Sequence, residues 1–200
     1  MQSFEPKSLS NFNLVKYSIE FFGRHFILIF GAGLIAGVGR TIQLGAIGEI
    51  SGGADSFLEL VIATARILTF ILILGEGRIS IGVQRVRSIF QLNRAQWQSI
   101  GLNIITRLKS NWLALLINLI VYSAIAMIIN YLIDKIAYNS NLLKALQNSH
   151  ILAANTTEWV ILLFFKNITV IPFTIIFNGF VLLWVANSGR FSKKSFGRTI

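Results

Sequence analysis

Four long apolar blocks are the feature of this sequence that most limits its fold. A helix rises 1.5 Å per residue, so about 20 apolar residues are needed to cross a hydrocarbon core of roughly 30 Å. The blocks predict transmembrane helices at about 25–48, 57–77, 112–133 and 159–187, within one polytopic domain that covers residues 1–200. The first block is apolar only as far as Gly39, which is short for a crossing. The fourth contains Pro172, which predicts a kink or a division into two helices.

The low content of charged residues indicates lipid, not water, as the solvent of these blocks. Charged residues make up 13% of the chain and hydrophobic residues 54%, whereas a soluble domain carries about 25% charged residues. The chain has no cysteine, which excludes disulfides, thiolate metal sites and Fe–S clusters. We therefore expect an all-α integral membrane protein, a four-helix transmembrane bundle with short interfacial or cytoplasmic helices.

The basic residues predict the orientation of the spans. They gather before the first block, between the second and third, and after the fourth, whereas the two other loops contain only Lys135 and Lys144. Basic loops stay on the cytoplasmic side of a membrane. The sequence thus predicts that both termini and the loop 78–111 are cytoplasmic, in a bacterial inner membrane or an organellar inner membrane.

Two segments outside the blocks have helical periodicity. Residues 11–24 place Phe12, Val15, Ile19 and Phe22 on one stripe, which predicts a short interfacial helix. This helix is either a docking element or a plain extension of the first span. The loop 78–111 repeats apolar residues at helical spacing from Trp97 onwards.

The basic part of that loop has two interpretations. Arg85, Arg87, Arg94 and Trp97 could contact anionic lipid headgroups or a cytoplasmic protein partner. Alternatively, the arginines only determine the topology. Gly75-Glu76-Gly77-Arg78 just before this loop predicts a helix end or hinge, because the glycines interrupt the helical pattern.

Small residues recur every four positions in the first block. Gly33, Gly37, Thr41 and Gly45 would form a groove along one helix face, which lets another helix approach closely. The groove predicts packing either against another span of the same chain or against a second subunit.

Ionisable residues inside the blocks are the strongest functional lead, because a charge at membrane depth usually has a partner or a water path. Arg40, Glu59, Arg66 and Lys166 fall in this class. Their depths predict an Arg40–Glu59 ion pair or an Arg40–Glu59–Arg66 cluster, and place Arg66 and Lys166 at similar depth.

Amides and hydroxyls form two further stripes, which would face each other across a polar seam. The third block contributes Asn118, Tyr122 and Asn130, and the fourth contributes Asn167, Thr174 and Asn178. As a pore lining, such a seam beside Arg66 and Lys166 would favour anions. As plain structure, the same groups would be interhelical hydrogen bonds of about 0.6 kcal/mol each.

The sequence contains no motif for nucleotide binding, hydrolysis or metal binding, so we expect no cofactor, no metal, no catalytic residues and no specific nucleic-acid partner. Two functional hypotheses remain. The first is a non-enzymatic accessory, scaffold or regulatory subunit that contacts lipids and other membrane subunits. The second is a small homo-oligomeric pore or transporter with a basic and polar lining.

Overall fold

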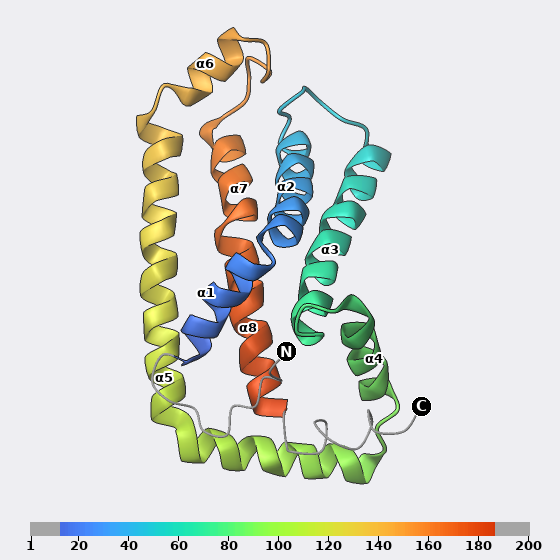
Figure 1. Ribbon diagram of the computed structural model, residues 1–200. Coiled ribbons are helices and arrows are strands. Elements are labelled where there is room, and N and C mark those ends of the chain that lie inside the picture. The colour runs from blue at the N-terminus through green and yellow to red at the C-terminus, as the bar shows by residue number, and fades with distance from the viewer. Residues whose placement is uncertain (1–12, 187–200) are drawn as a thin grey trace.

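The computed structural model describes residues 13–186, and all of its regular secondary structure is helical (Figure 1). The expected all-α class is confirmed. The helices are α1 (Asn13–Arg24), α2 (Phe26–Gln43), α3 (Gly52–Leu74), α4 (Ile79–Phe90), α5 (Arg94–Asn139), α6 (Leu142–Asn148), α7 (Glu158–Ile168) and α8 (Val170–Ala186). Residues 11 and 12 of the expected interfacial helix, residue 187 of the expected fourth span and both chain ends lie outside the described residues.

Four segments are long and apolar enough to cross a bilayer, which indicates a membrane protein. They are α2, α3, α5 and the continuous stretch of α7 and α8. The helix bounds differ from the expected spans at several points: α3 ends at Leu74 and not at 77, and α5 continues to Asn139 and not to 133. α2 ends at Gln43 because Gly45 and Gly48 adopt positive φ angles of 79° and 102° and form a turn. α3 begins at Gly52, since the Ser51 hydroxyl accepts a hydrogen bond from the Ala54 N–H and caps the helix.

A bend at Asn111 divides α5 into two parts with different directions. Asn111 has φ −128° and ψ 19°, outside the helical region. The first part, 94–110, lies across the ends of the other helices, and the second part, 112–139, runs alongside them (Figure 1). The segment expected as a loop at 78–111 therefore contains α4 and the first part of α5. We call the end of the molecule that carries these two helices the basic end, and the opposite end the α6 end.

The corner between α3 and α4 is built from glycines and closed by one arginine. Glu76 and Gly77 have positive φ angles of 52° and 94°. The Arg85 guanidinium donates to the Leu74 carbonyl oxygen at 2.6 Å and forms an ion pair with Glu76 at 2.7 Å. Arg85 thus satisfies a carbonyl at the C-terminal end of α3, which would otherwise have no donor.

The fourth apolar segment is divided into two helices. Thr169 has φ −126° and ψ −79°, and it separates α7 from α8 three residues before Pro172. Proline has no N–H, so the Ile168 carbonyl lacks its usual helical donor and the helix can break at this point. The sequence predicted either a kink or a division into two helices at Pro172, and the structure has two helices.

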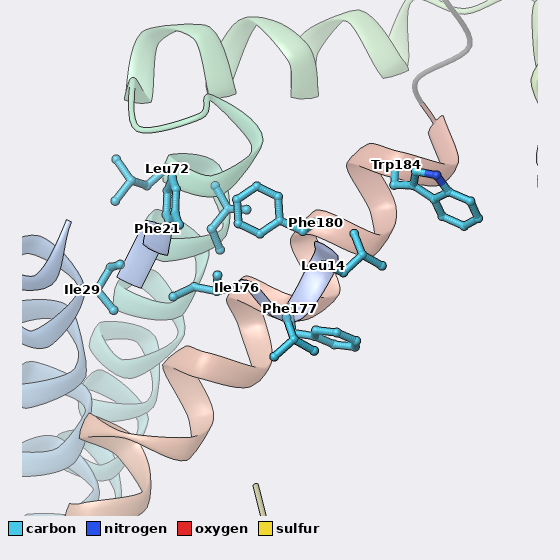
Figure 2. Close-up of a cluster of buried hydrophobic side chains, with 10 residues drawn as sticks. Leu14, Phe21, Ile29, Leu72, Ile176, Phe177, Phe180 and Trp184 are labelled. Atoms are coloured by element: carbon cyan, nitrogen blue, oxygen red, sulfur yellow. The ribbon is translucent and has the colours of Figure 1, made fainter. Parts of the chain in front are cut away.

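The largest apolar cluster joins helices that are far apart in the chain. Leu14 and Phe21 of α1 lie against Ile176, Phe177 and Phe180 of α8 (Figure 2). The other buried members of the cluster are Val15, Ile29, Leu72, Ile73 and Trp184. α1 crosses α8 obliquely and separates from α2 at His25, where φ is −110° and ψ is 23°. α1 is therefore a packed helix in its own right and not a straight extension of the first span.

The two connecting segments at the α6 end are tied to each other. The Ala153 N–H donates to the Ala46 carbonyl oxygen at 2.8 Å. The Gln147 side-chain amide lies within hydrogen-bond distance of the carbonyl oxygens of Ala153, Ala154 and Thr156. One glutamine thus organises the segment between α6 and α7.

We predict that Gly82→Ala destabilises the protein and that Gly101→Ala does not. A Cβ at Gly82 would lie 2.0 Å from the Ile71 carbonyl oxygen, whereas a Cβ at Gly101 meets nothing within 4 Å. Forcing the α3–α4 contact apart should cost about 1–3 kcal/mol, and Gly101→Ala should gain up to about 1 kcal/mol in helix propensity. Unfolding in mixed micelles measures both; equal stability of the two variants would contradict the close contact.

Candidate functional site

Polar side chains gather where α2 lies between α3 and α7. Arg40 of α2 forms an ion pair with Glu59 of α3, with Nη1 to Oε2 at 3.1 Å. One turn further along α2, the Gln43 side-chain amide donates to the Asp55 Oδ1 at 2.8 Å. With Arg66 and Asn167, these residues form what we call the polar cluster: Arg40, Gln43, Asp55, Glu59, Arg66 and Asn167. The ion pair expected from depth alone is thus present in the fold.

Arg66 is bound differently from the three-residue cluster expected from the sequence. Its Nη2 donates to the Asn167 Oδ1 at 2.9 Å, and no hydrogen bond joins it to Glu59 within residues 13–186. Two turns of α3 separate Glu59 from Arg66, about 10 Å along the axis, whereas Asn167 faces Arg66 from α7. Asn167 is buried, and its Nδ2 donates to the Leu163 carbonyl oxygen.

One atom of Arg66 remains without a partner. The Arg66 Nε is buried and has no hydrogen bond to any described residue. Beside it lies a cavity of about 10 Å³, lined by small residues of α2 and α3 and by the first turns of α8. This volume corresponds to roughly one water molecule. The cavity is therefore too small for an organic substrate or a continuous channel.

Two glycines of the small-residue groove allow α2 to approach α7 closely beside the polar cluster. A Cβ at Gly33 would lie 2.8 Å from the Asn167 carbonyl oxygen, and one at Gly37 would lie 3.3 Å from Phe164. Thr41 instead bonds to the Val38 carbonyl oxygen, and Gly45 lies in the turn beyond α2. The groove therefore packs against α7 of the same chain, through two of its four residues.

Asn118 has a role that its position in an apolar block did not suggest. Its Oδ1 accepts hydrogen bonds from the backbone N–H groups of Leu14 at 3.0 Å and Val15 at 3.3 Å. Its Nδ2 donates to the Ala114 carbonyl oxygen. The side chain is fully buried. Asn118 of α5 thus satisfies the free N–H groups at the start of α1, as a capping residue does, but from another helix.

The expected polar seam does not form as one continuous stripe. Tyr122 and Thr174 meet, with their hydroxyl oxygens 2.7 Å apart. Asn130 donates only to the Ala126 carbonyl oxygen of its own helix, and Asn178 is exposed on the surface. Asn118 accepts hydrogen bonds from α1 and Asn167 accepts one from Arg66, so the amides are dispersed over different helices. No continuous seam forms among residues 13–186, because Asn118 faces α1, Asn167 faces α3 and Asn130 bonds only within α5.

The other basic residues of interest, and Trp97, differ in their surroundings. Arg85 and Arg107 are internal, since they donate to the carbonyl oxygens of Leu74 and Trp184 near the C-terminal ends of α3 and α8. Arg87, Arg94 and Trp97 are exposed at the basic end. Lys166 is half-buried in α7 and has no ion pair with any residue from 13 to 186. The sequence analysis did not predict that Arg107 caps the C-terminal end of α8. The available signal was the position of this base just before the third apolar block.

His25, between α1 and α2, packs at the basic side of the bundle. Its ring lies 4.5 Å from that of Phe21, and a Cβ at Gly77 would fall 2.5 Å from the imidazole. Burial, and then the positive charge of Arg24, lower the pKa of His25. The imidazole is therefore neutral at pH 7 and acts as a packing group.

No protein-family model matches the chain, and neither characterised proteins nor solved structures show significant similarity to it. The geometry must therefore be interpreted from its own chemistry. Among residues 13–186, no three histidines or carboxylates converge on a point that could hold a metal ion. Several polar groups in the bundle bind one another or the ends of helices, as Arg66 and Asn167, Asn118 and Arg107 do.

We predict that Asn118→Leu loosens α1, because two backbone N–H groups lose their acceptor in an apolar site. Losing a helix cap costs about 1–2 kcal/mol. Unfolding in mixed micelles measures the loss, and hydrogen exchange of residues 14–18 locates it. Asn130→Leu is the matched control, since Asn130 bonds only within its own helix. Unchanged exchange in α1 would show that Asn118 does not hold it.

We predict that reversing either charge of the Arg40–Glu59 pair lowers stability and that reversing both restores it. Arg40→Glu and Glu59→Arg each leave like charges facing across α2 and α3, whereas the double variant recreates the pair. The coupling should reach about 0.5–3 kcal/mol, as for contacting residues. Unfolding of the four proteins in the same detergent measures it. Additive losses would mean that the pair contributes nothing by itself.

Proposed function

We propose that this chain is a non-enzymatic, multi-pass membrane protein that acts as an accessory, scaffold or regulatory subunit of a larger membrane assembly. In this proposal α2, α3, the second part of α5 and the α7–α8 segment are its four transmembrane spans. The basic end and both termini lie in the cytoplasm, following the positive-inside rule. The membrane is a bacterial inner membrane or an organellar inner membrane.

The observation that carries the proposal is Asn178. It lies in the middle of α8, whose other side chains are almost all apolar, and it is exposed on the surface of the bundle. Its amide makes no hydrogen bond to the described part of the chain. A carboxamide that faces hydrocarbon is costly, and association with another helix supplies its partner. Lipid alone offers no such partner at this depth.

Lys166 supports the same proposal from a neighbouring helix. It is a half-buried cation in α7, and none of the ion pairs among residues 13–186 includes it. Ionisable groups within spans usually pair with an opposite charge or reach water. A partner subunit that presents a carboxylate near α7 would supply that charge.

The alternative is a small homo-oligomeric pore or transporter. Within residues 13–186 the amides are dispersed over different helix pairs and line no continuous path, and the cavity beside Arg66 holds about 10 Å³. A pore would therefore have to form between copies. Exposed Asn178 and half-buried Lys166 are the groups that would line it.

Site-specific photo-crosslinking separates the two proposals. A photoreactive phenylalanine analogue at residue 178 should give an adduct with a different protein in native membranes. The same analogue at Ile128, which is 61% exposed on α5, is the control for a lipid-facing position. Adducts between identical chains at residue 178, together with ion flux in liposomes that contain the purified chain alone, would support the pore. Equal yields of lipid adducts at both positions would contradict both.

A further inference from the structure

The basic end has an unusual balance of charge. From Gly77 to Ile133 the chain contains six basic residues and not one carboxylate. Arg85 and Arg107 are already bound to the ends of α3 and α8. The side chains of the other four are exposed and form neither an ion pair nor a hydrogen bond to residues 13–186. These four are Arg78, Arg87, Arg94 and Lys109.

The same end exposes apolar side chains in an ordered pattern. On α4, Ile79, Val83 and Phe90 fall on one stripe at 100° per residue. Phe90 is 84% exposed, which is high for a phenylalanine in a helix. Arg87 lies directly beside this stripe. A stripe of this kind with a neighbouring base is typical of a helix whose apolar side enters the headgroup region of a membrane.

The first part of α5 repeats the pattern. Trp97, Leu102 and Ile105 are exposed there on the same side of the helix as Arg94 and Lys109, whereas Leu108 packs against the largest apolar cluster. Trp97 remains 51% exposed. Tryptophan is enriched at the boundary between lipid and water, where its ring is apolar and its N–H reaches polar groups. The bend at Asn111 turns this part of α5 across the bundle axis (Figure 1), the direction that a helix lying in the membrane surface requires.

We propose that α4 and the first part of α5 form a binding surface for anionic phospholipids. The phosphate groups would bind Arg78, Arg87, Arg94 and Lys109, and the acyl chains would cover Ile79, Val83, Phe90 and Trp97. The surface rests on the membrane embedding proposed above, but not on the subunit role, because lipid binding requires no protein partner. The absence of carboxylates from Gly77 to Ile133 removes local competitors for the phosphates.

The four bases determine how strongly the surface should prefer anionic lipid. Each exposed base near an anionic surface strengthens binding by about fivefold at low ionic strength. Four bases that act partly together should therefore give a preference of at least about tenfold over a zwitterionic lipid. Because the charges are exposed, salt should weaken the preference: the screening length falls from about 10 Å at 0.1 M to about 3 Å at 1 M.

The test uses the full chain in a mild non-ionic detergent. Dioctanoyl-phosphatidylglycerol and dioctanoyl-phosphatidylcholine are titrated separately, and the thermal unfolding midpoint is recorded at each concentration. The wild-type chain should respond to the anionic lipid at a concentration at least about tenfold lower. The variant Arg78→Gln/Arg87→Gln/Arg94→Gln/Lys109→Gln should lose that difference and keep its response to phosphatidylcholine. Lys135→Gln/Lys144→Gln, which removes the two bases near the α6 end, should behave as wild type.

Further measurements keep the proposal falsifiable if the fourfold variant is unstable. In the wild-type chain alone, raising NaCl from 50 to 500 mM should reduce the lipid preference severalfold. Glycerol 3-phosphate without acyl chains should bind much more weakly than the lipid. Equal response to the two lipids, a preference that salt leaves unchanged, or equal binding of glycerol 3-phosphate would overturn the proposal. It would also fail if the fourfold variant kept its lipid preference but lost a co-purifying soluble protein, which would assign the surface to protein docking.

Discussion

A polar group surrounded by apolar atoms is costly without a hydrogen-bond partner, and this cost accounts for several of the long-range polar contacts in the bundle. Asn118 joins α5 to the start of α1 because two backbone N–H groups there need an acceptor. Arg107 joins α5 to the last turn of α8, because the Trp184 carbonyl oxygen there needs a donor. At the α6 end, Gln147 provides donors to an irregular segment that has no helical bonds of its own. Helix ends thus determine which elements meet.

Close approach of helices depends on a second property, the absence of side chains at the crossing points. Gly33 allows α2 to touch the backbone of α7, and Gly179 allows α8 to pack against Ile73 of α3. These contacts place α2 where Arg40 reaches Glu59, and they bring α7 to the position where Asn167 reaches Arg66. The polar cluster therefore depends on glycines that take no part in its hydrogen bonds. A larger residue at Gly33 would displace the helix that carries Arg40.

The sequence could predict the all-α class, the four apolar segments and the Arg40–Glu59 contact, since each follows from apolar length or depth along a helix. It could not predict the partners of the amides. Asn118 and Asn130 look alike in an apolar run, yet one caps α1 and the other bonds to its own helix. The difference is set by where α1 packs, which no local pattern encodes. The division at Thr169 was foreseeable from Pro172, but its exact residue depends on how α2 contacts α7 at Asn167.

The division of the last apolar segment has a mechanical consequence. α7 packs mainly against α2 and α5, whereas α8 packs mainly against α1, α3 and α5 and touches α2 less extensively. At Thr169 the regular ladder of backbone bonds is already interrupted. A change in direction between α7 and α8 would therefore break fewer backbone hydrogen bonds at Thr169 than at a regular position inside either helix. Because Asn167 lies two residues before Thr169, such a change in direction would move its carboxamide relative to Arg66.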